Sequence, residues 1–216
     1  MISGSLKAPH EVMNKDVFWP AKPYWENYAI AWKSAPFGQY FKNSILMATT
    51  VVICQVLTGS LAGYAFAKLP FKLSKPIFFL FLCSMMIPSE ATIVSNFLTL
   101  AALRLTNTFF SVIVVSLVSM FSVFLFRQFY KTIDNALLEA AYIDGASTFQ
   151  VYTRVILPLM TPILSTVLIR EGLAIWNDFQ MPLITLNRSS KLWTLTIYLN
   201  NFQSELSVDY NLSFAC

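Results

Sequence analysis

Charged residues are scarce in this sequence: they make up 12% of its 216 residues, whereas hydrophobic residues make up 56%. A soluble domain usually carries about 25% charged residues, with which it covers its surface. The shortage therefore excludes an ordinary soluble protein and indicates an integral membrane protein. Most of the 15 basic residues lie in loops and not in one patch, so the formal net charge of +4 does not indicate a nucleic-acid partner.

Histidine and the common catalytic motifs are also nearly absent. His10 is the single histidine and lies in a polar stretch, and the sequence contains neither H-E-x-x-H nor a P-loop. These absences exclude a zinc-protease helix of the H-E-x-x-H type and ATP hydrolysis at a P-loop of this chain, and the single histidine argues against nucleophilic catalysis by a Ser-His-Asp arrangement. Of the three cysteines, Cys54 and Cys83 lie inside apolar runs, which argues against a disulfide framework. We therefore expect no catalytic residues, no cofactor and no metal site, and an energy source outside this chain.

Long apolar runs, by contrast, are frequent. An α-helix needs roughly 20 apolar residues to cross the hydrocarbon core of a bilayer. Four runs of about this length predict membrane spans at 44–66, 76–100, 109–126 and 158–175. The predicted fold is thus an all-α, polytopic membrane helix bundle that forms a single transmembrane domain over residues 1–216.

The basic residues beside these runs orient the chain. Lys68, Lys72 and Lys75 mark the loop after the first run, and Arg127 and Lys131 directly follow the third. Because cytoplasmic loops carry the excess of Lys and Arg, both of these loops are predicted to be cytoplasmic. The expected topology has a cytoplasmic loop at about 127–157 and external segments at about 1–42 and 184–216.

Several residues inside the apolar runs are unusual for a bilayer interior. Pro88 is expected to kink or break the second run. Glu90, Arg170 and Glu171 carry charges, each of which costs roughly 3 kcal/mol at the bilayer centre unless it faces protein or water. Together with Asn177, they are candidates for lining a translocation path. The alternatives are a wet position near the interface for Glu90 and polar contacts between helices for the other three.

Small residues recur along the first run. Gly59, Gly63 and Ala67 lie four residues apart, so they share one face of a helix. A face without bulky side chains allows the backbone of a neighbouring helix to approach closely. We therefore expect this face to pack against another helix inside the bundle.

One polar, helix-forming segment, residues 134–162, lies between the third and fourth runs; we call it the bracket. Apolar residues recur at helical spacing at its start and predict one narrow stripe on a helix. The stripe consists of Ile133, which directly precedes the bracket, and of Ala136, Leu137, Ala140 and Ala141. Gly145 can adopt the left-handed conformation that ends a helix, and Ser147 with Gln150 has the spacing of a capping box. The pattern predicts a helix–turn–helix at the membrane surface, with an ordinary solvated loop as the alternative.

The residues of the bracket resemble a known motif. Glu139-Ala140-Ala141 is followed after three residues by Gly145, and after nine more by Val155-x-Leu157-Pro158. This spacing resembles the EAA loop of ABC importer permeases, whose pattern has Ile where this chain has Val155. The longer string EAAYIDGAS is similar to the maltose-type, carbohydrate-importing branch, and IWNDFQMPL at 175–183 resembles a later stretch of that family.

The resemblance implies a function, a fold and partners. It implies a type I ABC importer permease in the plasma (inner) membrane, which translocates a sugar or oligosaccharide by alternating access. The expected partners are a second homologous permease, a cytoplasmic ABC ATPase dimer, an extracytoplasmic solute-binding protein and membrane lipid. The bracket would dock on the ATPase as the coupling helix, through Glu139, Ala140, Ala141, Asp144, Gly145, Leu157 and Pro158. Members of the family usually have six spans, so we expect the family's first and last spans to be missing here.

An ion-gradient-driven secondary transporter or channel subunit is the alternative function. The charged residues inside the spans and the broken second run support it, but it gives no reason for the bracket. A membrane scaffold without transport activity would explain the small-residue face but not the charges inside the spans.

Overall fold

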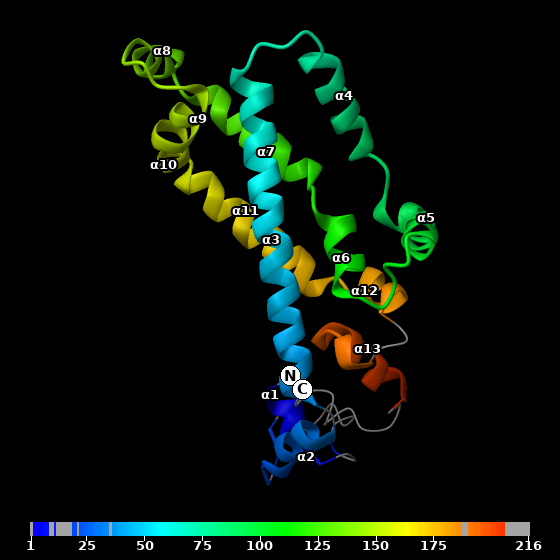
Figure 1. Ribbon diagram of the computed structural model, residues 1–216. Coiled ribbons are helices and arrows are strands. Elements are labelled where there is room, and N and C mark those ends of the chain that lie inside the picture. The colour runs from blue at the N-terminus through cyan, green and yellow to red at the C-terminus, as the bar shows by residue number, and fades with distance from the viewer. Residues whose placement is uncertain are drawn as a thin grey trace. The chain divides into compact units, whose positions relative to one another are not determined.

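The computed structural model describes residues 2–8, 11, 19–20, 22–34, 36–186 and 190–205. Within these residues every regular element is a helix (Figure 1), which confirms the predicted fold class. The chain divides into two compact units. The larger unit comprises Met47–Thr106 and Phe110–Trp176, and the smaller one comprises Met1–Leu46, Asn107–Phe109 and Asn177–Cys216.

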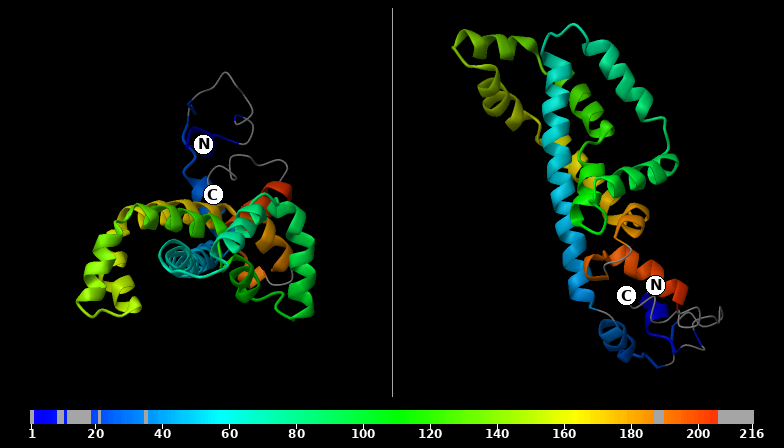
Figure 2. Two further views of the ribbon diagram at one scale, coloured as in Figure 1. Left: turned by 90° about the horizontal axis from the view of Figure 1, so that it is seen from above. Right: turned by 45° about the vertical axis from the view of Figure 1, so that its right-hand side comes forward.

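The larger unit contains most of α3 and the helices up to α11. In chain order these are α3 (Phe37–Lys68), α4 (Ser74–Ser84), α5 (Ser89–Ala102), α6 (Phe109–Ser116), α7 (Met120–Thr132), α8 (Asn135–Ile143), α9 (Thr148–Gln150), a π-helix (Val151–Ile156), α10 (Leu157–Leu159) and α11 (Thr161–Asn177). Figures 1 and 2 show α8 and α9 at the end of this unit where α7 finishes and α11 begins, away from α5.

Among the described residues, α3 is the one single helix that is long and apolar enough to cross a membrane. Three helix pairs pass the same test only together, and each pair is bent: α4 with α5 by 100°, α6 with α7 by 40°, and 148–159 with α11 by 76°. The four predicted runs thus correspond to one straight helix and three bent pairs.

The bend in the second run lies where proline predicted it. Helix α4 ends at Ser84 and α5 begins at Ser89, and Pro88 is the residue before α5 with an extended backbone (φ −64°, ψ 140°). Proline has no N–H to donate within a helix and its ring clashes with the preceding turn, so the helix stops before it and restarts after it.

The third run, predicted as a span at 109–126, is broken between Ser116 and Met120. Its freed backbone groups have partners on α3: Gln55 Nε2 donates to the carbonyl oxygen of Ser116 (2.8 Å), and Thr58 Oγ1 donates to that of Leu117 (3.0 Å). Ser119 then caps α7 by accepting a hydrogen bond from the backbone N–H of Ser122 (3.2 Å). A break inside an apolar segment is tolerated when neighbouring helices satisfy its backbone in this way.

Helices α3 and α7 pack closely at the small-residue face of α3, as predicted. A Cβ added at Gly63 would lie 2.7 Å from the Cβ of Phe126 and 2.9 Å from the backbone nitrogen of Arg127. A Cβ added at Gly59 would lie 3.1 Å from the Cβ of Ser122. The core of this unit continues from there towards the bracket, through Tyr64, Phe126, Tyr130, Leu138, Val151, Tyr152, Ile156, Met160 and Val167.

The smaller unit combines the start of α3 with helices from the first and last parts of the described residues. It contains α1 (Ile2–Ser5), α2 (Glu26–Ser34), α12 (Gln180–Thr185), a 3₁₀-helix (Ser190–Leu192) and α13 (Leu195–Glu205). Asn43 Nδ2 of α3 donates to the carbonyl oxygens of Lys191 and Trp193, both at 2.9 Å. The Tyr198 ring of α13 packs against Phe37 and Tyr40 of α3, with ring centroids 5.2 Å apart in both pairs.

Candidate functional site

The first half of the bracket is a helix with two well-formed ends. Asp134 caps α8 by accepting a hydrogen bond from the backbone N–H of Ala136 (3.0 Å). At the other end Gly145 has φ +81°, its N–H donates to the carbonyl of Tyr142, and the N–H of Ala146 donates to the carbonyl of Ala141, both at 3.0 Å. This pair of bonds is a Schellman motif, which requires the left-handed conformation that glycine adopts readily. The prediction that Gly145 ends a helix is confirmed.

The second half begins with the predicted capping box. Ser147 Oγ accepts from the backbone N–H of Gln150 (3.4 Å), and Gln150 Oε1 accepts from the N–H of Ser147 (2.7 Å). The chain then widens into the π-helix before Pro158. Because proline has no N–H, it cannot donate to the carbonyl of Arg154 as a continuous α-helix would require. The helix–turn–helix is therefore present, and the simple solvated loop is wrong.

One face of the bracket is anchored in the core of the larger unit. Leu138, Val151 and Ile156 are buried there, and the hydroxyl of Tyr152 lies 2.7 Å from Ser60 Oγ on α3. At the start of α8, Lys68 Nζ donates to the carbonyl oxygen of Ile133 and to Asn135 Oδ1, both at 2.6 Å. The bracket is thus fixed to α3 at two separate places.

The predicted apolar stripe of α8 is covered only in part, because Ile133 and Ala141 are partly buried against the core. Leu138 is buried and Ala141 is half-buried against the core, whereas Ala136, Leu137 and Ala140 are exposed. In so short a helix the periodicity marks apolar positions on adjoining faces, and packing against the π-helix Val151–Ile156 decides which of them is covered. Three of the five predicted positions therefore remain available to a partner.

The exposed side of the bracket carries large apolar side chains next to acidic ones. Ile143 is 86% exposed and Phe149 70% exposed, on either side of the turn at Gly145, and Leu137 is also exposed. The sequence-predicted residues that are exposed here are Glu139, Ala140, Asp144, Gly145, Leu157 and Pro158. Sequence reasoning missed Ile143 and Phe149, although two bulky apolar residues beside a glycine turn in a polar segment were a usable signal. Exposed residues of this kind outside an apolar run indicate a contact with another molecule.

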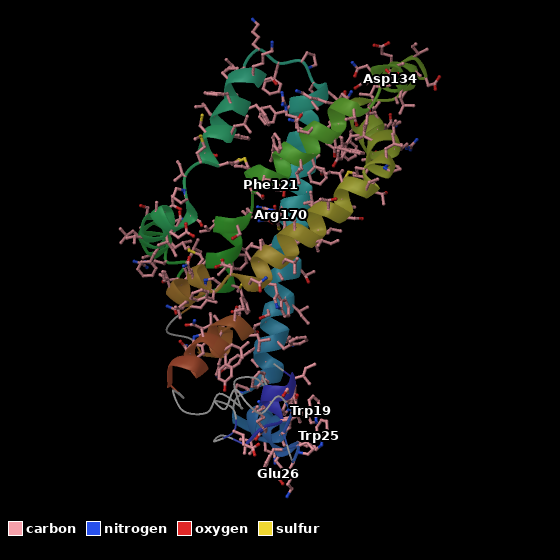
Figure 3. All side chains as sticks on the ribbon, turned by 180° about the vertical axis from the view of Figure 1, so that it is seen from behind. Trp19, Trp25, Glu26, Phe121, Asp134 and Arg170 are labelled. Carbon is pink, nitrogen blue, oxygen red and sulfur yellow. The ribbon has the colours of Figure 1, made fainter. Side chains whose placement is uncertain are left out.

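A second group of functional candidates meets beside the break between α6 and α7. The carboxylate of Glu171 is buried, with 4% of the residue exposed, and its Oε1 accepts from Ser119 Oγ (2.9 Å), Ser122 Oγ (3.0 Å) and Arg170 NH1 (2.6 Å). The guanidinium of Arg170 also lies over the ring of Phe121, 3.9 Å from its centroid (Figure 3). The structure thus brings Arg170 and Glu171 together with two serines that sequence reasoning missed.

The remaining candidates of the translocation path lie elsewhere. Glu90 is exposed in the first turn of α5, where a negative charge is favourable because of the helix dipole. Asn177 is exposed and belongs to the smaller unit. Beside it, Asp178 Oδ1 accepts from the backbone N–H groups of Gln180 (3.1 Å) and Met181 (3.4 Å) and so caps α12. Burial raises the pKa of Asp178, and these two hydrogen bonds oppose the rise.

The sequence matches one protein family over most of its length. Residues 55–214 match the profile of the binding-protein-dependent transport system inner membrane component. The arabinooligosaccharides transport system permease protein AraQ of Halalkalibacterium halodurans is 32% identical, over 100% of this chain and 78% of that protein. The melibiose/raffinose/stachyose import permease protein MelC of Bacillus subtilis is 31% identical, over 95% and 75%. The diacetylchitobiose uptake system permease protein NgcG of Streptomyces coelicolor is 30% identical, over 100% and 72%.

The fold also matches a solved structure. A crystal structure of a bacterial ABC transporter involved in the import of the acidic polysaccharide alginate contains a chain with a TM-score of 0.85. The match covers 99% of this chain and 80% of that chain, at 21% sequence identity, and so shows a shared fold.

These matches agree with the EAA spacing of the bracket and with the apolar helices of the larger unit. They place the chain in the plasma membrane as a multi-pass protein, and they identify it as a transport subunit and not an enzyme. The chain belongs to the family of binding-protein-dependent transport system inner membrane components, the transmembrane permease subunits of ABC importers.

Proposed function

We propose that this permease carries a sugar or an oligosaccharide across the plasma membrane by alternating access, driven by ATP hydrolysis on a partner subunit. The bracket is the observation that supports coupling of transport to a partner ATPase. It is fixed to the membrane helices on one side and exposes Glu139, Ile143 and Phe149 on the other. The substrate class is supported by the relatives, whose names specify arabinooligosaccharides, diacetylchitobiose, and melibiose, raffinose and stachyose.

The bracket is proposed to seat on a cytoplasmic ABC ATPase as a short helix in a groove. Leu137, Ile143 and Phe149 would supply apolar contacts, and Glu139, Ala140, Asp144, Leu157 and Pro158 would border them. Gly145 shapes the turn, and the half-buried Ala141 holds α8 against the core. A surface attached to the core in this way passes on a shift as a rigid body, so movement of the ATPase would reach α3, α7 and α11.

The proposed cycle uses the partners implied by the family. ATP binding would close an ATPase dimer and reopen the bundle, formed with a second homologous permease, towards a loaded solute-binding protein. Only a difference in the affinity of the two states for nucleotide and loaded binding protein can drive this change. Glu90, Arg170 and Asn177 are proposed to border the path, with Glu171 positioning the half-exposed guanidinium of Arg170.

The ion-gradient alternative depends on charges inside the spans. Two of these charges, Arg170 and Glu171, bind each other at 2.6 Å and are also held by Ser119, Ser122 and Phe121, so they do not require a transported ion as a partner. Transport into proteoliposomes tests the choice. Uptake that requires ATP hydrolysis and ignores the membrane potential would support the proposed importer, and uptake that follows an ion gradient without ATP would refute it.

The first prediction concerns docking. Glu139→Lys should reduce the amount of ATPase that co-purifies with the permease several-fold, because it reverses a charge on the exposed side of α8 and leaves the buried Leu138 and Ala141 unchanged. The amount of permease in the membrane should not change. Glu26→Lys, which reverses another exposed glutamate on the smaller unit, is the matched control and should retain the ATPase. If Glu139→Lys retains as much ATPase as this control, Glu139 is not part of the contact.

The second prediction concerns the turn. Gly145→Val should destabilise the bracket by about 1–2 kcal/mol, because a β-branched residue is strained at φ +81°. Among the described residues, none has an atom within 4 Å of a Cβ added at Gly145, so the effect is one of backbone conformation and not of space. Gly145→Asn is the control, since asparagine tolerates the left-handed region. Limited proteolysis of the bracket should show faster cleavage of the valine variant, and equal cleavage of both variants would contradict the prediction.

A further inference from the structure

Helix α2 of the smaller unit exposes a row of aromatic side chains. Trp25, directly before the helix, is 66% exposed, Tyr28 is 38% exposed and Trp32 is 66% exposed. These residues follow one another at i, i+3 and i+7, so they lie on one face, whereas the exposed charges of Glu26 and Lys33 lie on another. Figure 3 labels Trp25 and Glu26 at this end of the chain. We call Trp25, Tyr28 and Trp32 the aromatic row.

The orientation of α2 is fixed by the contacts of an adjoining side, about a third of a turn from the aromatic row. Asn27 is buried, and its Nδ2 donates to the carbonyl oxygens of Ser5 (2.8 Å) and Lys7 (3.1 Å). Ala31, one turn later, is buried as well. The hydroxyl of Tyr28 lies 2.7 Å from Ser5 Oγ, and the rings of Trp25 and Tyr28 stack with centroids 6.3 Å apart. Rotating α2 to bury its tryptophans would break these bonds, so their exposure is a property of the fold.

The aromatic row continues directly into the helix that crosses the membrane. Helix α2 ends at Ser34 and α3 begins at Phe37, so the two ends are three Cα–Cα steps apart, which is at most about 11 Å. Trp32 stacks on Phe37, the first residue of α3, with ring centroids 5.8 Å apart and an angle of 13° between the planes. Helix α3 is long and apolar enough to cross a membrane by itself. Its apolar run starts at residue 44, seven residues or about 10 Å along the axis after Phe37, which places α2 near the headgroup region at this end of α3.

The side-chain types of the row match that location. Tryptophan and tyrosine have an apolar ring with a polar group at its edge, and they concentrate where a bilayer meets water. A helix with one apolar aromatic face and one charged face lies in that plane with its apolar face towards the acyl chains. A sugar would instead require a concave site that surrounds it, whereas the aromatic row is one convex helix face.

We propose that α2 is an interfacial anchor: Trp25, Tyr28 and Trp32 insert into the headgroup region of the phospholipid bilayer and hold the first turns of α3 at a fixed depth. The occupant of this face is the lipid surface itself. The proposal uses the membrane location of the family and does not depend on ATPase coupling or on the transported substrate, so either proposal can fail without the other.

The test measures the depth of each tryptophan in the bilayer. The full chain, with its partner subunits, is reconstituted in phosphatidylcholine nanodiscs as variants that keep only Trp25 or only Trp32, with the other four tryptophans replaced by phenylalanine. Phosphatidylcholine brominated close to the headgroup should quench the fluorescence of Trp25 and of Trp32 at least twofold more than phosphatidylcholine brominated near the chain ends. Iodide in the buffer should quench each of these tryptophans only weakly. Glu26→Trp in a background without other tryptophans is the matched control on the charged face, where iodide should quench and brominated lipid should not.

Quenching of Trp25 and Trp32 by iodide as strong as that of the Glu26→Trp control, without quenching by brominated lipid, would overturn the proposal. Protection of both residues from iodide only when a solute-binding protein is added would also overturn it, because the face would then be a protein contact. If the single-tryptophan chains are not recovered, the double variant Trp25→Phe, Trp32→Phe replaces them. In this double variant, lipid brominated close to the headgroup should quench a smaller fraction of the total tryptophan fluorescence than it does in the wild type. An unchanged quenched fraction would again reject the anchor.

Discussion

Gly63→Leu is expected to prevent recovery of a folded permease. The added Cβ alone would lie 2.7 Å from the Cβ of Phe126 and 2.9 Å from the backbone nitrogen of Arg127, and both atoms belong to the rigid frame of α7. Neither atom can move as the end of a flexible side chain can, so α3 and α7 would have to separate. Overpacking of a core costs about 1–3 kcal/mol and sometimes more, and we expect this site at or above the upper end. Size-exclusion chromatography of a fluorescent fusion, before and after heating, measures the loss.

Other glycines of the same chain supply the controls. At Gly172, among the described residues, none lies within 4 Å of an added Cβ, so Gly172→Ala should be recovered like the wild type, or slightly better because alanine favours a helix. Gly59→Ala should be intermediate, because its Cβ would lie 3.1 Å from Ser122 Cβ and 3.3 Å from Phe126 Cδ2. Equal heat resistance of Gly63→Leu and Gly172→Ala would show that α3 and α7 do not pack as described.

The second large effect is expected at Glu171. Glu171→Leu removes the acceptor of Ser119, Ser122 and Arg170 at once and leaves two hydroxyls and a guanidinium beside an apolar side chain. Removing one member of a buried charge pair costs about 3–5 kcal/mol. Because the side chain of Arg170 is 48% exposed and can reach water, we expect the lower end of this range. The midpoint of thermal unfolding in detergent should fall accordingly.

Glu171→Gln separates hydrogen bonding from charge. Its amide oxygen can still accept from both serines, so its stability should lie between those of the wild type and the leucine variant. Glu90→Leu is the control, because Glu90 is exposed on α5 and its replacement should change the midpoint little. A leucine variant at position 171 that is as stable as the one at position 90 would mean that the carboxylate of Glu171 does not hold α7 and α11 together.

The local features of the bracket could be read from the sequence. The left-handed Gly145, the capping box of Ser147 with Gln150, and the break before Ser89 at Pro88 depend on residues within about five positions of one another. The conformational preferences of glycine, serine and proline are properties of the residues themselves. The EAA spacing was readable for the same reason, since it lies within one short stretch of chain.

The missed features depend on residues far apart in the sequence. The break in the third run has neither proline nor glycine, and it is accommodated by Gln55 and Thr58 on α3, about 60 positions earlier. Ser119 and Ser122 meet Glu171 about 50 positions later. The periodicity of α8 likewise could not tell whether Leu137 or Leu138 would be buried.

The sequence by itself determined that the chain is helical, that it lies in a membrane, and where its polar bracket turns, because composition, helical periodicity and local backbone preferences decide these properties. Only the tertiary structure decided which polar groups are satisfied inside the bundle and which apolar side chains remain exposed. Glu171 is held by serines of another helix, Ile143 and Phe149 remain exposed on the bracket, and the aromatic row of α2 faces outwards because Asn27 is fixed to the carbonyls of Ser5 and Lys7. Each of these outcomes depends on a contact between distant segments, and the pattern of one segment does not contain it.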